Sequence, residues 1–152
     1  MSFRITGLSA QPFAHLFGLS DAELATHGAL RFQGEGLPDR VELRDTVGEE
    51  AVLLVNHEHQ PADTPYRSRH AIFVRERAGE AFDAIDTVPD ALRRRMLSLR
   101  GFDAAGMMVD ADLVDGQQIE TLIERLLAQP EIAYIHAHFA RRGCYAALIR
   151  RG

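Results

Sequence analysis

Two runs of alternating residues near the C-terminus constrain the fold more than any other feature of the sequence. Residues 131–140 read EIAYIHAHFA, residues 144–150 read CYAALIR, and the tripeptide RRG separates them. Alternation with a period of two is the pattern of a β-strand whose two faces differ. A three-residue loop with glycine in the left-handed position joins antiparallel strands. We therefore predict a β-hairpin whose first strand has an apolar core face and a second face carrying Tyr134, His136 and His138.

Four further segments predict strands. Residues 51–55 (AVLLV) and 71–74 (AIFV) are apolar at both alternating sets of positions. This pattern is typical of central strands that are covered on both faces. Residues 96–102 and 107–110 flank the turn-like spacer DAAG, so we expect a second hairpin there.

Helices are predicted at separate places along the chain. Ser20 and Glu23 have the spacing of a capping box for a helix that ends before Gly28, and residues 12–17 read as a shorter helix. Residues 116–129 carry an apolar stripe at helical spacing, after Asp115 as the cap. Together the elements predict an α+β fold, a single domain over residues 1–152, with helices packed mainly on one face of a mostly antiparallel sheet.

Composition excludes several classes of partner. The 152 residues carry a net charge of -5, include no Trp and are 7% aromatic, which argues against a nucleic-acid binder. No run of 18 apolar residues predicts a membrane span. The N-terminus lacks a signal-peptide pattern and Cys144 is the only cysteine, so we expect a cytoplasmic protein. No pattern indicates an oligomeric state.

A polar segment separates the two strands predicted at 51–55 and 71–74. It reads NHEHQPADTPYRSRH over residues 56–70. If the two strands pair as a hairpin, their histidines converge at one end, and loops of this length are often functional. We predict that this segment binds a small anionic molecule, and the candidate ligand-binding residues are Asn56, Tyr66, Arg67 and His70. The alternative is a solvated surface loop.

The sequence contains two His-x-His pairs, HEH at 57–59 and HAH at 136–138. On a strand, such a pair places two imidazoles on one side, and both can ligate one metal ion. A metal site needs a third ligand, for which His70, Glu58 and Asp63 are available. Because the sequence does not show that the two pairs meet, we predict no cofactor. A divalent metal ion with His57 and His59 as candidate ligands stays an alternative to ordinary structural histidines.

Cys144 is placed by counting back from the predicted three-residue loop. In this register Ala140 lies opposite Cys144 and His138 lies opposite Ala146, so the thiol shares a face with His136 and His138. A thiol close to imidazole and guanidinium groups can act as a nucleophile. We therefore name His136, His138 and Cys144 as candidate catalytic residues. The alternative is that Cys144 is an inert small hydrophobe.

Three segments carry a resemblance to a known family. They are residues 56–74 (NHEHQPADTPYRSRHAIFV), 105–111 (AGMMVDA) and 134–150 (YIHAHFARRGCYAALIR). In this order and spacing they resemble a bacterial family called domain of unknown function number twelve-oh-three. The resemblance spans nearly the whole chain. It implies a small single-domain bacterial protein, and it transfers no activity, cofactor, partner or catalytic residue.

Two functions of different classes follow from these patterns. The first is an enzyme with one site at the end of the sheet, where the segment with Tyr66, Arg67 and His70 meets the hairpin with His136, His138 and Cys144. There, arginine holds an anionic group of a small molecule while a histidine moves a proton, with or without a metal ion. The second is a non-catalytic ligand-binding or protein-interaction module that uses the same residues as a recognition surface.

Overall fold

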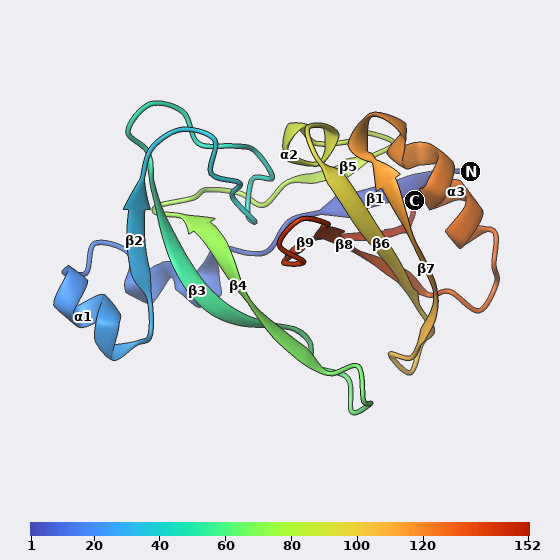
Figure 1. Cartoon of the computed structure of the whole chain (residues 1–152), viewed down its shortest axis with the longest axis horizontal. Helices are drawn as coiled ribbons and strands as arrows, with labels where there is room; N and C mark the ends of the chain where they lie inside the picture. Colours follow the sequence, from blue (N-terminus) through green and yellow to red (C-terminus); the bar gives the residue numbers. More distant parts are fainter.

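The computed structural model describes residues 1–152 and has an α+β fold built on two antiparallel sheets (Figure 1). The larger sheet has six strands in the order β5-β1-β9-β8-β6-β7, and the smaller has three in the order β2-β3-β4. The strands are β1 Phe3–Thr6, β2 Leu30–Gln33, β3 Ala51–Gln60, β4 Ser68–Arg75, β5 Asp83–Ile85, β6 Met96–Phe102, β7 Met108–Asp115, β8 Tyr134–Phe139 and β9 Tyr145–Arg151. The α-helices are α1 Asp21–Thr26, α2 Asp90–Arg93 and α3 Ile119–Leu127, and the 3-10 helices are η1 Gln11–Leu16 and η2 Gly116–Gln118.

The six-stranded sheet has two different faces. On one face, alternating apolar residues of β6, β8 and β9 pack against the buried stripe of α3. Ile135, Ala137 and Phe139 belong to this core, as the alternation of residues 131–140 predicted. The opposite face of β8 carries Tyr134, His136 and His138, and it turns toward the smaller sheet. The pairing of β6 with β7 confirms the second predicted hairpin.

The predicted helix boundaries are confirmed at the two strongest caps. The Glu23 backbone N–H donates to Ser20 Oγ, and the Ser20 N–H donates to Glu23 Oε1, which completes the capping box. Asp115 accepts a hydrogen bond from the backbone N–H of Gln117. The helix after Asp115 begins with one 3-10 turn, so its α-helical part is shorter than the predicted range 116–129.

The smaller sheet contains the predicted hairpin of β3 and β4. Its inner face consists of Leu53, Val55, Ile72 and Val74, which pack against η1 and α1. The N-terminal helical segments therefore cover the smaller sheet, whereas α3 covers the larger one (Figure 1). The prediction that residues 71–74 form a central strand is wrong, because β4 lies at the sheet edge and β3 takes the central place, beside an unpredicted β2.

The β8–β9 hairpin follows the predicted register over most of its length and then departs from it. Ala137 lies opposite Ala147 as predicted, but a β-bulge follows, and His138 lies opposite Tyr145 instead of Ala146. The Phe139 N–H donates to the Cys144 carbonyl. The loop that this residue pair closes therefore has four residues, 140–143, instead of the predicted three. Gly143 has φ +78, the left-handed conformation expected of the glycine.

Two contacts hold the ends of the two sheets together. The Gln60 side chain at the end of β3 donates from Nε2 to the Tyr134 hydroxyl on β8, at 2.9 Å. The Thr64 hydroxyl in the β3–β4 loop donates to the carbonyl of Gly106 in the β6–β7 turn, at 3.3 Å. The inner face at the end of β3 therefore lies against the histidine face of β8.

None of the helices is long and apolar enough to span a bilayer.

Candidate functional site

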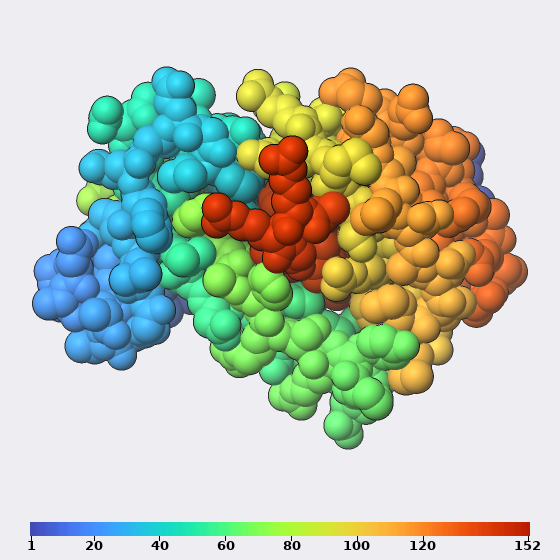
Figure 2. Space-filling view, in the orientation of Figure 1, coloured from blue at the N-terminus to red at the C-terminus, as the bar shows by residue number.

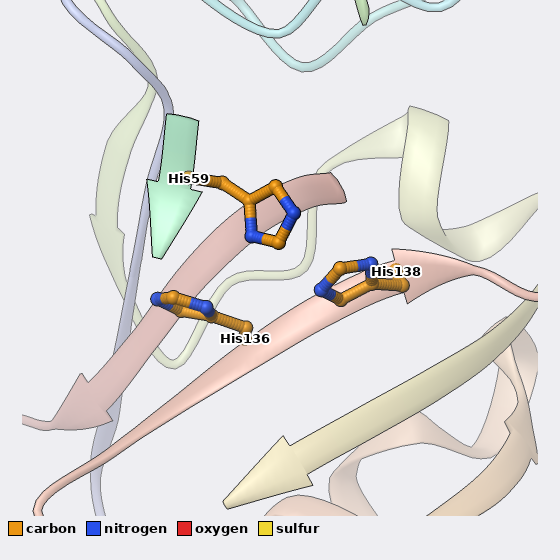
Figure 3. A group of neighbouring side chains, drawn as sticks. All are labelled: His59, His136 and His138. Carbon is orange, nitrogen blue, oxygen red and sulfur yellow. The ribbon is translucent and has the colours of Figure 1, made fainter. Parts of the chain in front are cut away.

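Three histidines from the two sheets converge where the sheets meet. His59 lies on β3, and His136 and His138 lie on β8 (Figure 3). One ring nitrogen of each histidine lies within 4.8 Å of those of the other two. The His59 ring centroid is 5.0 Å from that of His138 and 6.1 Å from that of His136. The two His-x-His pairs of the sequence therefore do meet in space, the first through one of its members.

The alternation of strand residues explains why these three rings share one space. His136 and His138 are two residues apart on β8, so both leave the sheet on the same face. His59 continues the inner face of β3, which begins with Leu53 and Val55 in the core. The first residues of this face pack against η1 and α1, but the end of β3 extends past these helices and lies against β8. His59 therefore contacts imidazole rings instead of aliphatic side chains.

Burial keeps the three histidines neutral. His138 is 1% exposed and His136 is 6% exposed. Burial lowers the pKa of His136 and of His138 to about 3, and that of His59 to about 4. The positive charge of Arg100 lowers all three pKa values further. At neutral pH each ring therefore has one nitrogen with a free lone pair, the form that binds a metal ion.

Hydrogen bonding assigns the tautomer of one ring and leaves the others without partners. His138 Nδ1 lies 2.9 Å from the Gly143 carbonyl oxygen, so it carries the proton and Nε2 carries the lone pair. The Nδ1 atoms of His59 and His136 are buried and have no hydrogen-bond partner. A buried polar atom without a partner is costly and calls for an explanation, of which a bound ion is one.

Tyr145 completes the packing around the histidines. Its ring stacks on His59 with a centroid distance of 5.3 Å and an interplanar angle of 8°, and it meets His136 edge-on at 5.1 Å. Burial raises the pKa of Tyr145, so its hydroxyl stays protonated. Tyr145 was not among the predicted site residues, because the β-bulge that brings it to the histidine face leaves no pattern in the sequence.

Arg100 supplies an uncompensated positive charge beside the histidines. It lies opposite His136 in the pairing of β6 with β8, and its Nε donates to Ser98 Oγ at 3.2 Å. No carboxylate lies within 4.0 Å of this half-buried guanidinium. Burial lowers its pKa. Arg100 was not among the predicted site residues either. It lies on the strand predicted at 96–102, but only the pairing of β6 with β8 places it beside the histidines.

Most of the predicted ligand-binding residues lie elsewhere. Asn56 is exposed on the outer face of β3, where its Oδ1 accepts a hydrogen bond from Arg69. Arg67 forms an ion pair with Glu58 on that same outer face, with Nε 3.2 Å from Oε2. The physical reason is alternation, because positions 56 and 58 cannot share a face with the histidines at 57 and 59.

Three other predicted residues do not join the three histidines. His70 is half-buried with its ring centroid 6.5 Å from that of His59, and its Nδ1 is buried without a partner. His57 packs edge-on against Phe13 at 5.8 Å. Tyr66 is 39% exposed and contacts the Phe102 ring instead, with centroids 6.3 Å apart.

Cys144 does not share the face of the histidines, which corrects the predicted catalytic group His136, His138 and Cys144. The β-bulge turns its side chain to the opposite face of the hairpin, where it joins the core that contains Phe139. There its Sγ accepts a hydrogen bond from Arg40 Nη2 at 3.0 Å. The histidines and the thiol therefore belong to two different environments.

Three neutral imidazoles that converge in this way form a ligand set that metalloenzymes use. A catalytic zinc ion commonly has three protein ligands and an open fourth position. Tetrahedral coordination at the usual Zn–N distance places the nitrogens about 3.3 Å apart. The distances between the three nitrogens are at most 4.8 Å, so they must shorten by up to about 1.5 Å when zinc binds. Rotations about the side-chain bonds can supply this shift.

The comparison with known proteins places the chain in a family. The model of the family described as protein of unknown function (DUF1203) matches residues 36–151. The match covers all three segments on which the resemblance was based and confirms it. No curated protein and no solved structure matches the chain. The chain belongs to the DUF1203 family.

Proposed function

We propose that this member of the DUF1203 family binds one divalent transition-metal ion through His59, His136 and His138, and uses it on a small anionic molecule. The observation that carries the proposal is the convergence of three neutral imidazoles from two sheets, two of which have a buried Nδ1 without a partner. A core built only for stability would fill this space with apolar side chains or satisfy these nitrogens.

The donor set selects the class of metal ion. Imidazole nitrogen suits zinc, copper, nickel and iron, whereas magnesium and calcium take oxygen ligands. No carboxylate belongs to the set of three. We therefore expect zinc or nickel to bind, and magnesium and calcium not to bind.

The surroundings favour an anion as the further ligand. Arg100 lies opposite His136 and has no carboxylate partner, so it can pair with a carboxylate or phosphate group of a bound molecule. A metal ion in such a site polarises a bound carbonyl or phosphoryl oxygen and activates bound water. The low pKa values of the histidines favour a ligand role over general acid catalysis, because a neutral imidazole has no second proton to give at pH 7.

The decisive experiment measures metal stoichiometry. Protein without a histidine tag is stripped with EDTA, titrated with zinc, nickel or magnesium by calorimetry, and its zinc content after gel filtration is measured by elemental analysis. We expect one zinc per chain for the wild type, and loss of the site in His59→Gln and in His136→Gln. His15→Gln is the matched control, since His15 is exposed on η1, where its ring contacts that of His27. Wild-type protein that retains no zinc, or variants that retain it as well as the control does, would overturn the proposal.

A second measurement separates an enzyme from a non-catalytic binder. The zinc-loaded protein is screened against carboxylate and phosphate esters, and the same compounds are tested for binding. Turnover that disappears in His59→Gln supports an enzyme. Binding without turnover supports the ligand-binding module that the sequence also allowed.

A further inference from the structure

We infer a second binding site on the opposite face of the β8–β9 hairpin, a pocket that binds a small organic anion through phosphate or carboxylate oxygens. Its volume is about 680 Å³, within the range of pockets that hold small molecules. Three segments form its walls: residues 36–40, residues 94–96 at the start of β6, and the turn between β8 and β9. In Figure 2 the red residues of the β8–β9 turn reach the surface between the blue residues near the N-terminus and the yellow residues of α2 and β6.

The charge of the pocket is opposite to that of the protein. Five of its thirteen lining residues are arginines, and a single aspartate, Asp115, lines it as well. The whole chain carries a net charge of -5. A concave surface whose charged residues are mainly arginines, on an acidic protein, attracts anions and raises their local concentration. The arginines are Arg40, Arg94, Arg95, Arg141 and Arg142.

Three of these arginines form no ion pair within the protein. Arg95 pairs with Asp45 at 2.8 Å, and Arg94 pairs with Asp90 at 2.7 Å. No carboxylate lies within 4.0 Å of Arg40, Arg141 or Arg142. An exposed arginine is stable without an ion pair. Because no carboxylate occupies these three guanidinium groups, they can donate hydrogen bonds to an anion that enters the pocket.

Arg40 is the strongest observation, because its guanidinium is buried. It is 1% exposed, and its nitrogens donate to the carbonyl oxygens of Tyr145 and Pro38 and to Cys144 Sγ. Burial lowers its pKa to about 10, so it remains charged at neutral pH. The buried Asp39 beside it raises its pKa, but the three groups that accept its hydrogen bonds carry no carboxylate. A buried cation without a direct ion pair is costly to the fold. Because Arg40 lines the pocket, a bound anion can form that ion pair.

The aromatic and apolar lining indicates the rest of the ligand. The Phe139 ring lies beneath two guanidinium groups, 4.7 Å from Arg40 Cζ and 5.1 Å from Arg95 Cζ. This stacking fixes the planes of the guanidinium groups before a ligand arrives. Phe73 and Met96 add apolar surface beside them. We therefore expect the anion to carry an apolar or aromatic part, which inorganic phosphate lacks.

The site does not depend on the proposed metal centre, and the experiment exploits this. EDTA-treated protein is titrated by calorimetry with phenyl phosphate, benzoate and inorganic phosphate. We expect phenyl phosphate or benzoate to bind more tightly than inorganic phosphate, and the stronger of the two identifies the preferred anionic group. Zinc-loaded protein should bind these anions as EDTA-treated protein does, so the failure of one proposal leaves the other standing.

A charge-matched pair of double variants tests the pocket itself. Arg141→Ala with Arg142→Ala removes two guanidinium groups from an exposed turn, so the fold should survive. Arg67→Ala with Arg125→Ala removes the same charge from exposed positions outside the pocket. We expect the first double variant to lose at least about tenfold in affinity and the second to lose little. Absence of binding at millimolar probe concentrations, or equal losses in the two double variants, would overturn the inference.

Discussion

His138 lies opposite Tyr145 in the β8–β9 ladder, one position away from the partner that an unbroken register would give it. This single offset separates two environments. It places the Tyr145 ring against the three histidines, and it sends Cys144 and its bond to Arg40 to the other side of the hairpin. The Tyr145 backbone carbonyl also accepts a hydrogen bond from Arg40 Nε, so one residue contacts both proposed sites.

The first prediction concerns the Tyr145 ring. Tyr145→Ala should destabilise the protein by about 3–5 kcal/mol, as expected when a buried aromatic ring is removed, and should weaken zinc binding because His59 loses the ring it stacks on. Tyr145→Phe keeps the ring and should retain both stability within about 1 kcal/mol and zinc affinity. Urea denaturation and calorimetry measure these effects. Equal zinc affinity in Tyr145→Ala would mean that the ring does not position His59.

Local patterns predicted the local elements well. The capping box at Ser20, the helix after Asp115 and the β3–β4 hairpin depend on residues close together in the sequence, and all three are present. The convergence of the two His-x-His pairs required a contact between strands more than 70 residues apart, which no alternation pattern records. The same holds for Arg100, which reaches the site only because β6 pairs with β8.

Asn56 and Cys144 were misplaced for different physical reasons. Alternation along a strand puts Asn56 on the face opposite His57, so the sequence pattern itself separates this residue from the histidines. The β-bulge that displaces Cys144 could not be predicted in this way, because it needs no special residue and competes with an unbroken ladder by small differences in packing.

The second prediction concerns Gly106, which holds the β6–β7 turn against the β3–β4 loop. A Cβ at this position would lie 2.3 Å from the Ala62 Cβ, and its φ is +85. Gly106→Ala should therefore destabilise the protein by about 1–3 kcal/mol more than Gly48→Ala. Gly48 also has a positive φ, at +55, but a Cβ there meets nothing within 4 Å. Urea denaturation measures the stability of the two variants. Similar losses of stability would show that the β6–β7 turn can move away from Ala62 at little cost in free energy.

The third prediction is a loss of stability in mild acid for the metal-free protein. The folded-state pKa of His136 is about 3, below its ordinary value of about 6.5, so the unfolded chain binds this proton first. The contribution of neutral His136 to the free energy of unfolding is therefore complete above pH 6.5, and it decreases as the pH falls toward 3. Between about pH 5.5 and 4, this residue alone should contribute a slope of about 1.4 kcal/mol per pH unit.

One variant isolates this slope from the titration of carboxylates, which also weakens the fold in acid. His136→Gln should lower the slope by that amount, measured by urea denaturation between pH 4 and 7 in EDTA. A wild-type slope equal to that of His136→Gln would show that His136 is protonated within the folded protein.

The last prediction is that metal binding stabilises the fold, because the three ligands belong to two different sheets. A metal ion that bridges β3 and β8 binds the folded chain far better than the unfolded one. At a free zinc concentration one hundred times the dissociation constant, the gain is about 2.7 kcal/mol, or roughly 5–10 °C in Tm for a chain of this length. Scanning calorimetry should show this increase for the wild type and for His15→Gln, and its reversal by EDTA. His59→Gln removes the only ligand from the smaller sheet and should abolish the increase while His136 and His138 remain. An increase of the same size in His59→Gln would mean that zinc does not bridge the sheets.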